Sequence, residues 1–197
     1  MKRLALFASG TGSNAKKIIS YFKEHELIEV SLLISNKPKA GALSMAREHG
    51  VPTLVIDRAS FYQSTDILGI LEEHGVDWLI LAGFLWLVPP YLVEAFQDRI
   101  INIHPALLPA YGGKGMYGMH VHRAVHEAGD EKSGITIHLV NERYDEGAVL
   151  FQAECTLETT DSPEDIARKV QQLEHEHFAR VIEKTVLTTS APTSKEL

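Results

Sequence analysis

Short apolar segments alternate with longer stretches of helical periodicity along the first half of the chain. Each apolar segment has the length of a strand, and the stretches between them carry apolar residues at helical spacing. Strands that alternate with helices form a mostly parallel sheet with right-handed crossovers and with helices on both faces. We therefore expect an α/β fold. The expected strands are 4–8, 30–34, 53–56, 78–82 and 100–104.

The expected helices of this half are 14–25, 41–49, 60–74 and 89–96. After residue 104 the pattern changes to a glycine-rich loop at 111–119, a short helix at 122–128 and two strands at 135–140 and 149–156. The polar turn between these two strands predicts an antiparallel edge on the parallel core. A final helix begins at Ser162, where a cap, Pro163 and acidic residues stand together, and continues to about Lys184.

Length and composition favour a single domain at 1–187, with 188–197 as a flexible polar tail. The net charge of -7 excludes a general affinity for nucleic acid or anionic membranes. Cys155 is the only cysteine, so no internal disulfide can form. No run reaches the roughly 18 apolar residues of a membrane span, and the apolar stretch near Met1 is too short for a signal peptide. We expect a cytoplasmic protein.

The segment Ile100–Pro109 begins as an apolar strand and turns polar at Asn102 and His104. Because ligands bind at the carboxyl ends of the strands of an open α/β sheet, this strand delivers an amide and an imidazole to a candidate site. Imidazole transfers protons near neutral pH, and an amide donates to a developing oxyanion. A structural histidine and a turn asparagine are the alternative interpretation of these two residues.

A glycine loop follows the first strand and precedes the first helix. Its residues are Ser9, Gly10, Thr11, Gly12, Ser13 and Asn14. Backbone N–H groups in such a loop, together with a helix N-terminus, favour an anion such as a single phosphate monoester. The loop lacks the third glycine of the dinucleotide fingerprint and the Gly-Lys of a P-loop, and a simple strand-to-helix turn is the alternative.

Other polar residues lie farther along the chain. Asp145 is either a turn residue or a carboxylate that raises the pKa of His104 by its charge. His120, His122 and His126 suggest zinc, but their spacing completes no ligand set, so we expect no metal site. Gln171 and Glu174 share one face of the last helix, which is either solvated or directed toward a ligand.

Taken together, these residues resemble the phosphoribosylglycinamide formyltransferases, the folate-dependent glycinamide ribonucleotide transformylases of purine synthesis. The resemblance covers residue 4 to about residue 183. The Asn-x-His-Pro stretch with Leu-Leu-Pro is typical of folate formyltransferases and their hydrolase relatives, and the glycine loop narrows the resemblance to the ribonucleotide enzymes. The segments that carry it are 9–14, 81–84, 101–109, 134–138, 145–147 and 171–175.

The resemblance implies a Rossmann-like formyltransferase fold and transfer of a formyl group from 10-formyltetrahydrofolate to glycinamide ribonucleotide, without metal. It divides the chain into a phosphate-binding half at about 1–100 and a folate-binding and catalytic half at about 101–187. The implied catalytic residues are Asn102, His104 and Asp145, with His138 in support. The implied ribonucleotide contacts are Gly10, Thr11, Gly12, Ser13, Asn14, Gln171 and Glu174. The implied folate contacts are Leu85, Trp86, Leu87, Val88, Asn102, Asn141, Glu142, Arg143 and Tyr144.

In the implied mechanism, Asn102 and a protonated His104 stabilise the tetrahedral oxyanion, and Asp145 favours the charged imidazole. The implied partners are small-molecule substrates, and the protein would be a monomer or a homodimer. Two features depart from the family pattern, namely Trp86, where relatives often have arginine or another polar residue, and the long loop at 112–118.

Three alternatives remain open. A formyltetrahydrofolate hydrolase usually has an extra amino-terminal domain, which a chain that starts at the first strand is not expected to have. Methionyl-tRNA formyltransferases need a tRNA-binding carboxyl-terminal domain, for which neither the length nor the acidic charge leaves room. A non-catalytic nucleotide-binding module would keep the phosphate loop but would place His104 far from Asp145.

Overall fold

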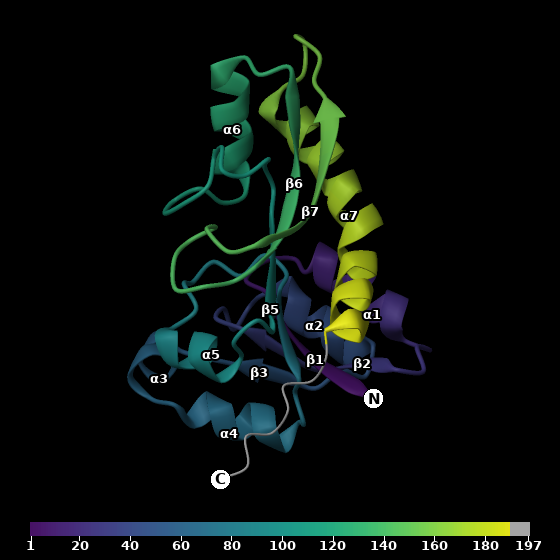
Figure 1. Ribbon diagram of the computed structural model, residues 1–197, viewed down its shortest axis with the longest axis vertical. Coiled ribbons are helices and arrows are strands. Elements are labelled where there is room, and N and C mark those ends of the chain that lie inside the picture. Colours follow the sequence, from purple (N-terminus) through teal and green to yellow (C-terminus); the bar gives the residue numbers. More distant parts are fainter. Residues whose placement is uncertain (190–197) are drawn as a thin grey trace.

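A seven-stranded sheet runs through the computed structural model, which describes residues 1–189 (Figure 1). Its strand order is β3-β2-β1-β4-β5-β6-β7. The pairings among β1 to β5 are parallel, and β6 and β7 add an antiparallel edge, so the expected sheet is confirmed. The strands are β1 Lys2–Phe7, β2 Ile28–Ser35, β3 Thr53–Val55, β4 Trp78–Leu81, β5 Ile100–His104, β6 Lys132–Leu139 and β7 Val149–Thr156.

Helices cover both faces of the sheet, as the alternating pattern predicts (Figure 1). Side chains of α1, α2, α6 and α7 belong to one buried cluster, and those of α3, α4 and α5 belong to a second. The helices are α1 Ser13–Phe22, α2 Gly41–Glu48, α3 Arg58–Gln63, α4 Asp66–Glu73, α5 Pro90–Ala95, α6 Met119–Ala128 and α7 Pro163–Thr188.

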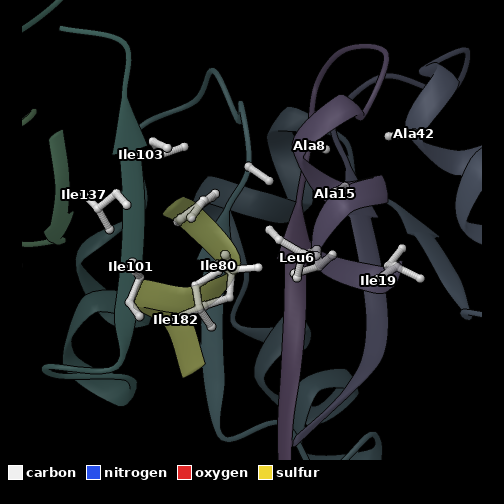
Figure 2. Packing of buried hydrophobic residues seen from close by; sticks show 14 of the residues in the cluster. Leu6, Ala8, Ala15, Ile19, Ala42, Ile80, Ile101, Ile103, Ile137 and Ile182 are labelled. Carbon is white, nitrogen blue, oxygen red and sulfur yellow. The ribbon is translucent and has the colours of Figure 1, made fainter. Parts of the chain in front are cut away.

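Strand β1 shows why the core has two halves. Successive side chains of a strand point to opposite faces, so Leu4 and Leu6 enter the first cluster while Ala5 and Phe7 enter the second. Figure 2 shows the first cluster, in which Leu6 lies among branched side chains of neighbouring strands and helices. A strand that is apolar on both faces is buried on both, which is the usual state of a parallel sheet.

The prediction of a single helix at 60–74 is wrong. The chain forms two helices there, α3 and α4, because Ser64 adopts an extended conformation between them. The Asp57 side chain caps α3 by accepting from the N–H groups of Ala59 and Ser60, and the Ser64 hydroxyl accepts from the N–H group of Asp66. Hydrogen bonds from polar side chains to the neighbouring backbone compete with the backbone hydrogen bonds of a helix. The spacing of apolar residues does not reveal this competition.

Helix boundaries in the second half also differ from those expected. Helix α6 begins at Met119 rather than at 122, and α7 continues to Thr188 rather than ending near Lys184. The capping box at Ser162 and Asp165 that starts α7 is present as predicted. Thr188 is therefore helical rather than part of the expected tail, and residues 190–197 of that tail lie outside the described residues. Among residues 1–189, no helix is both long and apolar enough to cross a bilayer.

The strand order of the sheet changes direction between β1 and β4, which is a topological switch point. Strands β2 and β3 lie on one side of β1, whereas β4 and β5 follow on the other. The loops after β1 and β4 therefore leave toward opposite sides, which opens a crevice at the carboxyl ends of these strands. The glycine loop that follows β1 and the segment that follows β5 both lie at this edge of the sheet.

Candidate active site

A cavity of about 720 Å³ lies at the carboxyl ends of β1, β4 and β5. Its size is typical of a small-molecule site. The residues that follow these strands line it, together with the loop at 113–119, the turn at 143–145 and one face of α7. Segments that are far apart in the sequence therefore meet around one hollow at the predicted edge of the sheet.

Most of the residues predicted for the site line this cavity. They are Gly10, Thr11, Gly12, Ser13, Asn14, Leu85, Trp86, Leu87, Val88, Asn102, His104, His138, Arg143, Tyr144, Asp145, Gln171 and Glu174. Asn141 and Glu142 are not among the lining residues, in contrast to the expected folate contacts. The Asn141 side chain instead accepts from the N–H group of Arg143, and so shapes the turn rather than the cavity wall.

His104 and Asp145 form a close pair inside the cavity. The Nδ1 atom of His104 lies 3.6 Å from Oδ1 of Asp145, and only 4% of the His104 side chain is exposed. Their convergence with Asn102 on one cavity is therefore confirmed. The other ring nitrogen, Nε2, lies 2.8 Å from the backbone oxygen of Tyr111.

Burial lowers the pKa of His104 below its ordinary value of 6.5, although the Asp145 charge and the Tyr111 carbonyl both act to raise it. The expected raising effect of the carboxylate is present, but the cost of placing a charged imidazole away from water is larger. The pKa of His104 is therefore lowered overall, because burial outweighs the charge of Asp145.

Asp145 is ionised in this environment. Burial alone would raise its pKa, but the neighbouring imidazole of His138, the charge of His104 and the N–H group of Gly113 together lower the pKa below 3.8. Its Oδ2 atom accepts from that N–H group at 2.9 Å, and its backbone has a φ of 57°. The carboxylate is thus held from one side by the 112–118 loop and from the other by two imidazoles.

The side chain of His138 orients the amide of Asn102. Strands β5 and β6 place these two residues opposite each other, and Nε2 of His138 lies 3.1 Å from Nδ2 of Asn102. The Nδ1 atom of His138 lies 2.8 Å from the Leu139 carbonyl oxygen, which can only accept, so Nδ1 carries a hydrogen. In neutral His138, Nε2 then accepts one amide hydrogen of Asn102, and the second amide hydrogen is left for a ligand.

The glycine loop has the geometry of an anion site. Gly12 has a φ of 81°, in the left-handed region, and no side chain caps the N-terminus of α1. The first N–H groups of α1 thus have no side-chain cap, which favours a negatively charged ligand. A Cβ atom at Gly12 would lie 2.7 Å from Cβ of Ala42, whereas a Cβ atom at Gly10 would meet nothing within 4 Å.

Glu174 and Asn14 join α7 to this loop. The amide nitrogen of Asn14 donates to the Glu174 carboxylate at 2.9 Å, and burial raises the pKa of Glu174. The Oδ1 atom of Asn14 is buried and has no hydrogen-bond partner among the described residues. A buried acceptor without a partner costs free energy unless a ligand donor reaches it, so this end of the cavity is suited to a hydroxyl or amine ligand.

Aromatic side chains form the opposite wall. Trp86 packs against Phe61 and Tyr62 at ring-centroid separations of 5.7 and 6.0 Å. The Tyr62 hydroxyl donates to the Leu87 carbonyl, and the Leu85 N–H group donates to the hydroxyl of Ser9. The 85–88 segment is therefore held by α3 and by the loop after β1, and its apolar side chains line the cavity.

Sequence reasoning missed some lining residues. Lys37, Phe84, Lys114 and His122 also face the cavity. Lys37 follows the carboxyl end of β2, so the rule that ligands bind at this edge of the sheet was a usable signal. His122 was considered only as a metal ligand, but within residues 1–189 no three His, Cys, Asp or Glu side chains are grouped to hold a metal ion.

A family model described as "Formyl transferase" matches residues 2–182 of the chain. Among curated proteins, the chain is 44% identical over 187 residues to phosphoribosylglycinamide formyltransferase, chloroplastic, of Arabidopsis thaliana, covering 92% of this chain and 64% of the relative. It is 34% identical to phosphoribosylglycinamide formyltransferase of Haemophilus influenzae, covering 92% of this chain and 86% of the relative. The chain thus spans less than two thirds of the length of the plant relative.

Solved structures show the same similarity. Phosphoribosylglycinamide formyltransferase of Bacillus halodurans superposes with a TM-score of 0.85 and 35% identity, covering 96% of this chain and 97% of that one. Glycinamide ribonucleotide transformylase 1 of Symbiobacterium toebii superposes with a TM-score of 0.86 and 32% identity, covering 98% and 91%. The expected fold class is therefore confirmed over nearly the whole chain.

Proposed function

Because the chain belongs to the formyl transferase family, we propose that it transfers the formyl group of 10-formyltetrahydrofolate to the amine of glycinamide ribonucleotide. The observation that carries the proposal is the placement of His104, Asp145 and Asn102 in the same cavity as the glycine loop. An acid-base pair, an oxyanion donor and an anion site are the parts that this reaction needs.

The two substrates would occupy opposite ends of the cavity. The ribonucleotide phosphate would bind the Gly10–Asn14 loop, and its ribose hydroxyls would meet Glu174 and the free Oδ1 atom of Asn14. The pterin would lie against the 85–88 segment, where the apolar wall suits a flat heteroaromatic ring. Each proposed site would then draw on both halves of the chain, because the 85–88 segment lies before residue 100 and Glu174 lies after residue 101.

In the proposed reaction the amine of the ribonucleotide attacks the formyl carbon, and the carbonyl electron pair moves to the oxygen. The second amide hydrogen of Asn102 is available to stabilise this oxyanion, because His138 accepts the first. Collapse of the adduct breaks the bond between the formyl carbon and N10. The amine loses one proton and N10 gains one, and the His104–Asp145 pair is the neighbouring group that can take up and return it.

The alternatives fit the molecule less well. A non-catalytic binding module predicts His104 and Asp145 far apart, whereas they are 3.6 Å apart. A hydrolase would use water in place of the amine and would have no need of a phosphate-binding loop. The similar proteins reported above carry the names of transferases, which also favours the amine as the acceptor.

A direct assay tests the proposal. Purified protein is mixed with glycinamide ribonucleotide and 10-formyltetrahydrofolate, and the release of tetrahydrofolate is followed together with formylated ribonucleotide. Product should form only when both substrates are present. Release of formate and tetrahydrofolate without the ribonucleotide would identify a hydrolase. If neither formate nor formylated ribonucleotide forms, both activities are rejected.

The variant Gly10→Val tests the phosphate site. Its side chain would enter open space rather than protein, so we expect a higher KM for the ribonucleotide and little change in the KM for the folate. Gly12 is unsuitable for this test, because a side chain there would collide with Ala42 and would be strained at a φ of 81°. Steady-state kinetics with each substrate varied in turn give the measurement. An equal rise in both KM values would place the phosphate elsewhere.

A further inference from the structure

The backbone carbonyl of Tyr111 determines where His104 carries its proton. This carbonyl oxygen lies 2.8 Å from Nε2 of His104, and a carbonyl oxygen can only accept a hydrogen bond. Nε2 is therefore protonated whenever the contact exists, in the neutral imidazole as well as in the charged one. Only Nδ1, which lies 3.6 Å from Asp145, remains to gain or lose a proton.

The Tyr111 side chain anchors that carbonyl. Its hydroxyl donates to Oδ2 of Asp130 at 2.6 Å, next to the C-cap of α6, and its ring packs against the buried core. The bond to Asp130 raises the pKa of Tyr111 to about 12, so the hydroxyl remains a donor at working pH. Tyr111 is also one of three non-glycine residues with positive φ in the described chain, at 56°. This conformation is unfavourable for a side chain with a Cβ atom and needs such support.

We infer that Tyr111 is a positioning residue, whose bond to Asp130 holds the carbonyl that keeps a proton on Nε2 of His104 and so confines proton exchange to Nδ1. Loss of the anchor would free the loop after Pro109 and allow the ring proton to move to Nδ1. In a neutral imidazole with its hydrogen on Nδ1, that hydrogen would face Asp145. Nδ1 could then no longer accept a proton.

Other titratable groups also face this imidazole. His138 on β6 lies 3.6 Å from Asp145, and His122 on α6 is close enough for its charge and that of His104 to oppose each other. Neither makes a hydrogen bond to His104 among the described residues, so they influence its charge but not the choice of nitrogen. Asp145, which lies 3.6 Å from Nδ1, favours a hydrogen on that nitrogen, whereas the Tyr111 carbonyl favours one on Nε2. The carbonyl is at hydrogen-bond distance and the carboxylate is not, so the carbonyl makes the choice.

The inference is tested first without any substrate. Protein with ¹⁵N-labelled histidine is examined by long-range ¹H–¹⁵N correlation NMR, which distinguishes the two neutral tautomers of each ring, with His104→Asn used to assign the signal. We expect neutral His104 with its hydrogen on Nε2. A wild-type protein with the hydrogen on Nδ1 overturns the inference without the use of any variant.

The variant Tyr111→Phe removes only the hydroxyl. We expect a mixture of both His104 tautomers and a loss in kcat of roughly tenfold, corresponding to about 1.4 kcal/mol, with little change in either KM. Asp130→Asn keeps an acceptor and should retain the wild-type tautomer, whereas Asp130→Ala should match Tyr111→Phe. Tyr21→Phe is the control, because it removes a hydroxyl that bonds Glu183, and neither residue lines the cavity.

An unchanged tautomer and unchanged kcat in folded Tyr111→Phe would also overturn the inference. Its effect on turnover rests on the proposed function, but its effect on the tautomer does not. If the assay detects no formyl transfer while His104 carries its hydrogen on Nε2 and loses that preference in Tyr111→Phe, the proposed function fails and the positioning role of Tyr111 stands.

Discussion

Asp145→Asn should lower kcat by about 10²-fold or more, with a smaller change in the affinity for either substrate. The carboxylate lies 3.6 Å from the imidazoles of His104 and His138 and is the one anion beside His104 in the described chain. Asparagine has nearly the same size and still offers an oxygen to the N–H group of Gly113. The fold should therefore survive, while proton transfer at His104 loses the charge that supports it.

The pH–rate profile of Asp145→Asn should shift in a defined direction relative to that of the parent protein. Burial already places the pKa of His104 below 6.5, and Asp145 opposes this effect by favouring the charged imidazole. Removal of the negative charge should lower the pKa further. The limb of the kcat profile assigned to His104 should therefore move to lower pH, whether the acid or the base form of the imidazole is required.

Glu154→Gln is a matched control for this experiment. It makes the same change of carboxylate to amide at an exposed residue of β7 that pairs with Lys132, outside the cavity. It should leave kcat and the pH profile unchanged. If Asp145→Asn behaves like this control, Asp145 is a turn residue and the catalytic group must be reassigned.

Gly134→Ala should destabilise the fold by about 3 kcal/mol, as overpacking between rigid elements does. Gly134 lies on β6 opposite Glu154 of β7, and a Cβ atom there would lie 2.1 Å from the backbone oxygen of Ala153 and 2.7 Å from the Leu107 side chain. Backbone of a paired strand cannot move away without loss of the ladder. The β6–β7 hairpin also carries His138 and leads to the turn with Asp145, so activity should fall together with stability.

Urea unfolding measures this effect, and Gly69→Ala provides the comparison. Gly69 lies within α4, where a Cβ atom would meet nothing within 4 Å. Alanine there should stabilise the protein by roughly 0.5–1 kcal/mol, because glycine is a poor helix former. If Gly134→Ala unfolds at the same urea concentration as the parent protein, the hairpin adapts more readily than its packing indicates.

Local patterns in the sequence were sufficient for the architecture. The apolar runs of β1, β4 and β5 and the cap of α7 are visible without any structure, because strand burial and helix capping depend on residues close in the chain. The same patterns predicted one helix where α3 and α4 form, since the extended conformation of Ser64 leaves no trace in apolar spacing.

The order of residues along the chain also indicates which groups reach the candidate site. Asn102 and His104 lie at the carboxyl end of β5, and the glycine loop follows the carboxyl end of β1. The carboxyl ends of parallel strands lie at the same edge of a sheet, so these groups meet there. The protonation of these groups, by contrast, depends on how the whole chain packs around them. The segment around Tyr111 and the turn with Asp145 lie against His104, which is buried, and this burial, rather than the nearby carboxylate, determines the direction of its pKa. Desolvation depends on everything that excludes water from a group, and residues distant in the chain supply that exclusion.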